Sequence, residues 1–217
     1  MNHMTAEELI AFEAHIQQLW ETGELPFLVH LCGGNEKELI SIFSEVKEGD
    51  WIFSSHRAHY HYLLAGGPPE RLETLIRNGR SMFVFDKKRH FLSSSVLGGT
   101  CGIAAGVAWQ LKEEGSSNRV WCFLGDGAEE EGHFYESVLF VEGNELPCTF
   151  VVEDNDRSVD TEKSKRRGKA QIAWPSCVRR YHYISTWPHA GSGCKHQIVF
   201  KEDIVKRLLE PVEISAK

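Results

Sequence analysis

The sequence has 217 residues, of which 41% are hydrophobic and 25% are charged, and its formal net charge is −7. These values are ordinary for a globular protein, and the length allows one domain with a full hydrophobic core. The negative charge argues against general nucleic-acid binding, which requires a basic surface that neutralises phosphates. No apolar run approaches the ~20 residues of a membrane-spanning helix, and the first residues do not resemble a signal peptide. We therefore expect a cytoplasmic protein without a nucleic-acid or membrane partner.

Six cysteines are spread along the chain without a CxxC pair, and several of them lie inside apolar runs. They are Cys32, Cys101, Cys122, Cys148, Cys177 and Cys194. This pattern favours buried free thiols in a reducing compartment over disulfides or zinc ligands.

The first half of the chain contains three helix patterns and one short strand pattern. Thr5-Ala6-Glu7-Glu8 has the form of a capping box, and the apolar spacing that follows predicts a helix ending near Gly23. A second helix is expected after Asn35, and residues 50–54 are typical of a short strand. Pro68-Pro69 begins a further helix that should end near Asn78-Gly79.

The second half predicts a strand–helix–strand unit. Small residues dominate between Thr100 and Lys112, as expected where a helix packs closely on a sheet. An apolar strand over 119–124 is followed by a helix pattern carrying Phe134 and Val141, and then by a second buried-type strand over 149–152. This succession predicts a three-layer α/β fold with a parallel sheet flanked by helices.

Polar residues follow both predicted strands. Gly125-Asp126-Gly127 alone is a common turn after a strand. Asn155, however, lies at the end of the next strand, and one helical crossover connects the two strands. Both side chains then lie at the carboxyl edge of the sheet, where open α/β folds bind ligands. A Mg²⁺ ion requires carboxylate, amide or carbonyl oxygens together with phosphate oxygens. Asp126, the Asn155 side chain and a loop carbonyl at about Arg157 therefore predict a metal site that also holds a diphosphate.

The stretch 125–161 resembles the thiamine-diphosphate motif, in which GDG is followed by a helix-linked Asn. It looks most like the α subunit of the decarboxylating component of 2-oxo-acid dehydrogenase complexes, whose pattern is GDGxxxxGxxxE, then LP, then a strand ending in ENN. Asp154 replaces the first Asn of that pattern, whereas the metal-binding second Asn is kept as Asn155. The other matches are Gly132, Glu136, Leu146-Pro147 and Glu153.

The resemblance extends to other parts of the chain. Ser55-His56-Arg57-Ala58-His59 resembles the family's YRxH stretch, with His56 in place of the tyrosine. Ser95–Gly99 falls where the family contacts the aminopyrimidine, and His189 falls in the loop that closes over the cofactor. The resemblance thus implies cofactor binding by His56, Arg57, Leu97, Gly99, Gly125, Asp126, Gly127, Ala128, Asn155 and Arg157, and catalysis by His59 and His189.

The implied protein is an α-type subunit that binds thiamine diphosphate and Mg²⁺. It would decarboxylate a 2-oxo acid and transfer the resulting acyl or aldehyde unit. We expect residues 1–217 to form a single diphosphate-binding domain, shortened after about residue 161 relative to the family. A β-type subunit would supply the missing half of the site in an α₂β₂ assembly. Two alternatives are a split transketolase-like or carboligase subunit that transfers a two-carbon unit to an aldehyde or sugar, and a non-catalytic α-like binding subunit.

Three further features have competing interpretations. His56, His59 and His61 could form a zinc cluster, but no cysteine or acidic partner is placed with them, and helix packing is favoured. Glu129-Glu130-Glu131 is interpreted as a solvated helix start. The basic stretch Lys163–Lys169 is expected to be a solvated loop, or else a loop that closes the active site or docks a partner.

Overall fold

The computed structural model describes residues 4–159, 161–170, 172–187 and 189. In this part of the chain six strands form one sheet in the order β2-β3-β1-β4-β5-β8. Only β2 and β3 pair antiparallel, and the other neighbouring strands are parallel. The predicted α/β class is therefore confirmed. The strands are β1 (Trp51–Ser54), β2 (Phe85–Asp86), β3 (Phe91–Ser93), β4 (Val120–Gly125), β5 (Cys148–Asp154) and β8 (Val178–His182).

The helices expected from periodicity are present, with bounds close to those predicted. At the first of them, Thr5 Oγ1 accepts from the backbone N–H of Glu8, and the Glu8 carboxylate accepts from Thr5 N, which completes the capping box. The α-helices are α1 (Ala6–Glu21), α2 (Glu36–Phe43), α3 (His59–Leu64), α4 (Pro69–Arg77), α5 (Cys101–Glu113), α6 (Gly132–Gly143) and α7 (Lys163–Arg167). Short 3₁₀ turns cover η1 (Lys87–Arg89) and η2 (Ala128–Glu130).

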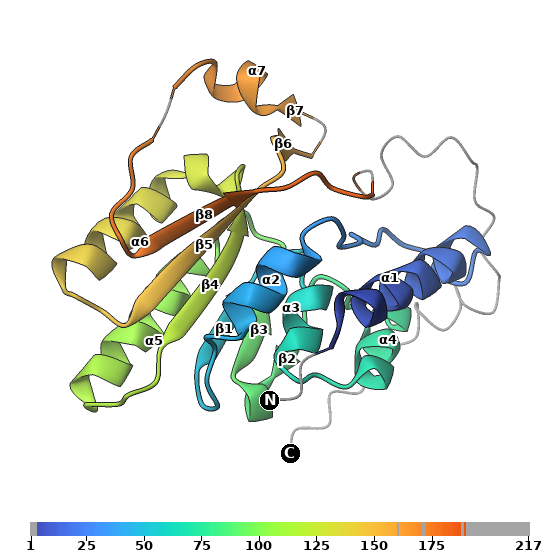
Figure 1. Ribbon diagram of the computed structural model, residues 1–217, viewed down its shortest axis with the longest axis horizontal. Helices are drawn as coiled ribbons and strands as arrows, with labels where there is room; N and C mark the ends of the chain where they lie inside the picture. Colours follow the sequence, from blue (N-terminus) through green and yellow to red (C-terminus); the bar gives the residue numbers. More distant parts are fainter. Residues whose placement is uncertain (1–3, 160, 171, 188, 190–217) are drawn as a thin grey trace.

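Helices cover both faces of the sheet, which gives three layers. Side chains of α1 to α4 pack in one hydrophobic cluster, and those of α5 and α6 pack in a second. Figure 1 shows α5 and α6 on one side of the sheet and α2 and α3 on the other. Strand β4 joins the clusters, because Trp121 and Phe123 enter the first whereas Val120, Cys122 and Leu124 enter the second. A strand buried on both faces explains its continuous apolar sequence.

The chain beyond β5 forms a small cap over the carboxyl edge of the sheet. Strands β6 (Arg157–Ser158) and β7 (Thr161–Glu162) pair antiparallel, and α7 follows directly. In Figure 1 this cap lies beyond the ends of β4 and β5. The expectation of a solvated loop over Lys163–Lys169 is therefore wrong for Lys163–Arg167, which are helical and hold ion pairs described below.

The cysteine prediction is confirmed for the five cysteines within the described residues, all of which are free thiols. Four of them are buried, and Cys177 is partly exposed. Cys194 lies outside the described residues. Among the described helices, none combines the length and the apolar character needed to cross a membrane.

A buried polar network joins α1, α3 and the segment after α4. His59 Nδ1 lies 2.8 Å from Glu13 Oε1, and His59 Nε2 lies 2.9 Å from Ser81 Oγ. All three side chains are buried. In this arrangement His59 donates to the Glu13 carboxylate and accepts from the Ser81 hydroxyl. Its ring thus links α3 to a polar group of α1 and to one of the segment after α4.

Ser81→Ala is expected to lower the free energy of unfolding by about 1–3 kcal/mol, because it leaves a buried imidazole nitrogen without its partner. Ser41→Ala, at an exposed position on α2, is the matched control and should change stability little. Chemical denaturation of the two variants and the parent measures the difference. Equal stability of the Ser81→Ala variant and the parent would contradict this role for the network.

Candidate functional site

A cavity opens at the carboxyl edge of the sheet, between the ends of β1, β4 and β5. Most of the residues predicted to bind cofactor line it, together with the predicted catalytic residue His189. Those lining residues are His56, Arg57, Leu97, Gly125, Asp126, Gly127, Ala128, Asn155, Arg157 and His189. Gly99 and His59 do not line it. Segments that are far apart in the sequence therefore meet at one edge of the sheet, as predicted. His59 lies outside this cavity, in the network with Glu13 and Ser81.

Asp126 is held at the end of β4 with 1% of its surface exposed. Its Oδ2 accepts a hydrogen bond from Arg166, whereas its buried Oδ1 has no hydrogen-bond partner among the described residues. Burial raises the pKa of Asp126 to about 6, an effect that outweighs the attraction of Arg166 and Lys163. The site thus contains a buried carboxylate whose negative charge is only partly compensated.

Asn155 lies beside Asp126, because β4 and β5 are parallel neighbours and their register pairs Gly125 with Glu153. The Asn155 Oδ1 accepts from the backbone N–H of Arg157 at 3.1 Å, which holds the side chain in the turn after β5. The glycine at 127 is required at this point, since a Cβ there would collide with the side chain of Ser158. The two polar strand ends therefore present a carboxylate and an amide oxygen to the same cavity.

Basic residues of α7 cover the acidic edge formed by Asp126, Glu129 and Asp154. Arg166 pairs with Asp126, and Arg167 Nη1 lies 3.0 Å from Glu129. Lys163 Nζ lies 2.5 Å from Asp154. Burial acts to raise the pKa of Asp154, but the hydrogen bond from Lys163 and the backbone lower it overall. The segment expected to be solvated thus acts as a counterion to the carboxylates.

Glu129 contradicts the interpretation of a solvated helix start. Only 1% of its surface is exposed, and its carboxylate accepts from Trp174 Nε1 at 2.8 Å. Besides Arg167, Arg180 Nε lies 3.2 Å from it. The run of three glutamates therefore has one buried member, which anchors the chain after α7 to the end of β4.

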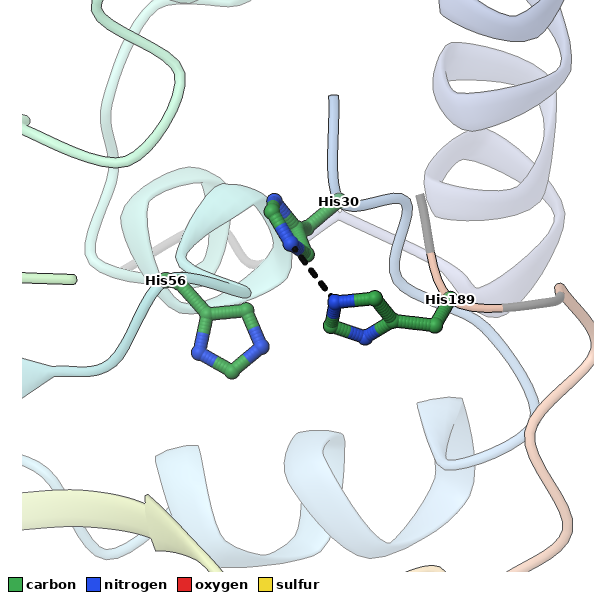
Figure 2. Close-up of side chains that lie close together, drawn as sticks. All are labelled: His30, His56 and His189. Atoms are coloured by element: carbon green, nitrogen blue, oxygen red, sulfur yellow. Dashed lines mark hydrogen bonds between the residues drawn. The ribbon is translucent and has the colours of Figure 1, made fainter. Parts of the chain in front are cut away.

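The opposite wall of the cavity carries Arg57, His56 and His189, and His30 contacts His189. Arg57 Nη1 donates to the backbone carbonyl of Leu31 at 2.6 Å, and Nη2 lies 3.5 Å from His189 Nδ1. His189 Nε2 lies 3.2 Å from Nε2 of His30. Figure 2 shows these two rings and that of His56 turned toward one another from three separate segments.

Two of these histidines are held neutral. Burial, together with the positive charge of Arg57, lowers the pKa of His30 to about 3. Burial and the charge of Arg57 likewise lower the pKa of His56 to about 3. Both rings are therefore unprotonated at pH 7, and Arg57 is the fixed positive charge on this wall.

The segment predicted to contact the aminopyrimidine approaches the cavity from a third side. The carbonyl of Leu97 accepts from His133 Nε2 on α6 at 2.9 Å. Gly98 has φ +65°, and a side chain there would collide with the His133 ring. Gly99 is bonded to the carbonyl of Val96 and does not reach the cavity.

Three residues near the site, His30, Tyr183 and Arg166, lacked a strong sequence signal. Tyr183 and His30 follow no motif, so only the folded structure brings Tyr183 to the cavity and His30 into contact with His189. Arg166 belongs to a basic run, but the sequence does not show that it pairs with Asp126. Glu153 matched the family pattern, and it is buried with hydrogen bonds from Asn35 at 2.9 Å and Tyr181 at 2.5 Å.

The suggested cluster of His56, His59 and His61 does not form. His61 is buried against Ser54 and Glu153, and His59 against Glu13 and Ser81. Helix packing, the favoured interpretation, accounts for both residues, whereas His56 faces the cavity.

Comparison with known proteins relates this site to a family. The family model described as dehydrogenase E1 component matches residues 4–175. The α subunit of an acetoin:2,6-dichlorophenolindophenol oxidoreductase from Bacillus subtilis is 31% identical over 158 residues, 68% of this chain and 47% of that protein. The α subunit of the pyruvate dehydrogenase E1 component from Rickettsia typhi is 32% identical over 164 residues, 71% of this chain and 50% of that protein.

These similarities have a defined extent. The chain spans about half the length of the curated relatives it matches. The matched region 4–175 nevertheless contains the strands β1, β4 and β5 and the polar residues that follow them. On this evidence the chain belongs to the dehydrogenase E1 component family.

Proposed function

We propose that this chain is the α-type subunit of a two-subunit enzyme that uses thiamine diphosphate and Mg²⁺ to decarboxylate a 2-oxo acid and transfer the resulting unit. The proposal rests on the positions of Asp126 and Asn155. Both follow neighbouring parallel strands and line the same cavity as Arg57. Family membership supports the cofactor. The free thiols of the described cysteines fit the cytoplasmic location that we include in the proposal.

The residues at this edge fit a hard divalent cation. Asp126 Oδ1 is a buried carboxylate oxygen without a hydrogen-bond partner among the described residues, and such an oxygen is costly unless a cation or donor satisfies it. We assign Asp126, the Asn155 amide oxygen and the Arg157 carbonyl to Mg²⁺. Arg166 now pairs with Asp126, so we infer that the ion takes its place when the cofactor binds.

The diphosphate is assigned to the glycine turn and to Arg57. Gly125, Gly127 and Ala128 bring backbone close to the cavity, and Arg57 offers a planar fork that suits two phosphate oxygens. His56 and Leu97 line the same space and complete the proposed binding set. Gly99 is left out of this set, because it does not reach the cavity.

When bound, thiamine diphosphate would supply the nucleophilic carbon chemistry that decarboxylation of a 2-oxo acid requires. The chain's own residues hold the cofactor, exclude water and move protons. We assign proton transfer to His189, which faces the cavity beside Arg57. His59 is given a structural role instead, because it is buried in the Glu13–Ser81 network.

The names of the relatives point to two classes of donor. The Rickettsia typhi protein is named for pyruvate, and the Bacillus subtilis protein is named for acetoin. We propose a short 2-oxo acid as the donor, and turnover of pyruvate and of acetoin by the assembled enzyme should be measured side by side.

A β-type subunit completes the proposed site, in an α₂β₂ assembly. The outer surface of α5 and α6 supports such a partner, since large apolar side chains are exposed there and Trp109 stacks on Phe140. These exposed side chains are Ile103, Trp109, Tyr135, Leu139 and Phe140. A contiguous apolar surface of this kind is typical of a protein–protein contact.

Asp126→Ala is expected to abolish Mg²⁺-dependent binding of thiamine diphosphate, because the metal loses its carboxylate ligand. Glu113→Ala, an exposed carboxylate on α5, is the control and should bind as the parent does. Calorimetry on the chain assembled with its β-type partner gives the affinities. Unchanged cofactor affinity in the Asp126→Ala variant would refute the metal assignment.

Leu139→Glu is expected to weaken association with the β-type subunit by more than about tenfold. The side chain is 75% exposed, and burying it at an interface is worth roughly 1.5–3 kcal/mol, which a buried glutamate forfeits. Ile10→Glu on α1, 51% exposed, is the control. Sedimentation or light scattering of the mixed subunits measures assembly. If both variants assemble as well as the parent, α5 and α6 do not carry the interface.

A further inference from the structure

His189 lines the cavity and follows an irregular segment, residues 183–187, which continues from strand β8. We propose that Gly33 and Gly34 are positioning residues that fix this segment and so hold His189 beside Arg57. The inference rests on the proposed function only in giving His189 a part in turnover. The attachment of the segment is a property of the chain without cofactor.

Apolar burial does little to hold the 183–187 segment beyond its first residue. The side chain of Ile184 is 82% exposed, and Thr186 is exposed as well. The backbone provides an attachment instead, because Thr186 N donates to the carbonyl oxygen of Gly33 at 3.1 Å. This bond lies shortly before His189 in the chain, so it limits how far that ring can move.

The close approach of the two segments requires glycine at both positions. Gly34 has φ +95°, and a Cβ there would lie 2.0 Å from the carbonyl oxygen of Ile184. A Cβ at Gly33 would lie 2.9 Å from Thr186 Cβ and 3.0 Å from Trp187 Nε1. The obstacle at Gly34 is backbone, which cannot turn aside as a side chain can. Gly34 is therefore the more restrictive of the two positions.

The backbone that carries the glycines also holds Arg57. The carbonyl oxygen of Leu31 accepts from Arg57 Nη1 at 2.6 Å, and Arg57 Nη2 lies 3.5 Å from His189 Nδ1. One short run of backbone thus fixes the guanidinium directly and the imidazole through the Gly33 bond. Such preorganisation matters for catalysis, since misplacement of a group by about 1 Å can lower a rate by about a hundredfold.

Gly34→Ala is the sharpest variant, and Gly66→Ala is its matched control. Gly34 and Gly66 have φ of +95° and +79°, so alanine strains the backbone at either position. A Cβ at Gly66 meets nothing within 4 Å, whereas a Cβ at Gly34 meets the backbone of Ile184. The difference between the two variants therefore isolates the collision from the strain of the positive φ.

Hydrogen exchange in the full chain without cofactor, followed at single amides by NMR, measures the attachment. In Gly34→Ala the protection of the Thr186 amide should fall by about fivefold or more, the order expected for one lost hydrogen bond. Gly66→Ala should keep the protection that the parent shows. Equal protection of Thr186 in the two variants, or none in the parent, would overturn the inference.

Turnover of a 2-oxo acid by the assembled enzyme measures the consequence for His189. Gly34→Ala should lower kcat by about tenfold or more, because the group that transfers protons is displaced. Its affinity for thiamine diphosphate should change little, since Arg57 keeps its bond to Leu31. Gly66→Ala should match the parent in both quantities. An unchanged kcat in Gly34→Ala, or equal losses in both glycine variants, would overturn the positioning role.

The outcome is separable from that of the proposed function. If the parent assembly does not bind thiamine diphosphate, the proposed function fails, while hydrogen exchange still decides whether the segment is attached. Circular dichroism confirms that Gly34→Ala is folded. If it is not, Thr186→Pro removes the N–H that donates to Gly33 without altering the glycines, and it should lower kcat in the same way.

Discussion

The site depends on one constraint, the parallel pairing of β4 and β5 as neighbours in the sheet. Their backbone register pairs Gly125 with Glu153, so the residues that follow each strand must meet at the same edge. Three carboxylates gather there, and burying them together is unfavourable unless cations compensate. In this structure the cations are Lys163, Arg166 and Arg167 of α7, together with Arg180 of β8. The position of α7 over the sheet edge is thus a consequence of the charge that the two strand ends create.

The fold and this edge were predictable because their signals are local. Two apolar strands separated by one helix imply the crossover that brings Asp126 and Asn155 to one edge, and both residues line the cavity. The burial of Glu129 was not predictable, since its partners Trp174 and Arg180 are distant in sequence. The same applies to His30, whose contact with the cavity residue His189 joins segments that are far apart in the sequence. The position of His59 outside the cavity could not be predicted either, because a motif position does not reveal which way a buried ring faces.

The two walls of the cavity differ in the chemistry that they offer to a ligand. The strand ends present hard oxygen donors, whereas the facing wall presents the imidazoles of His56 and His189 beside the Arg57 guanidinium. The replacement of a tyrosine by His56 is what makes this wall unlike the family pattern.

The central claim is that a metal bound to diphosphate replaces Arg166 at Asp126. A crystal structure of the chain with its β-type partner, thiamine diphosphate and Mn²⁺ in place of Mg²⁺ tests it directly. The account predicts an anomalous-scattering peak within about 2.0–2.2 Å of the Asp126 carboxylate and the Asn155 amide oxygen, with Arg166 moved away from Asp126. An ordered cofactor with Arg166 still paired to Asp126 and no peak between the two strand ends would contradict it.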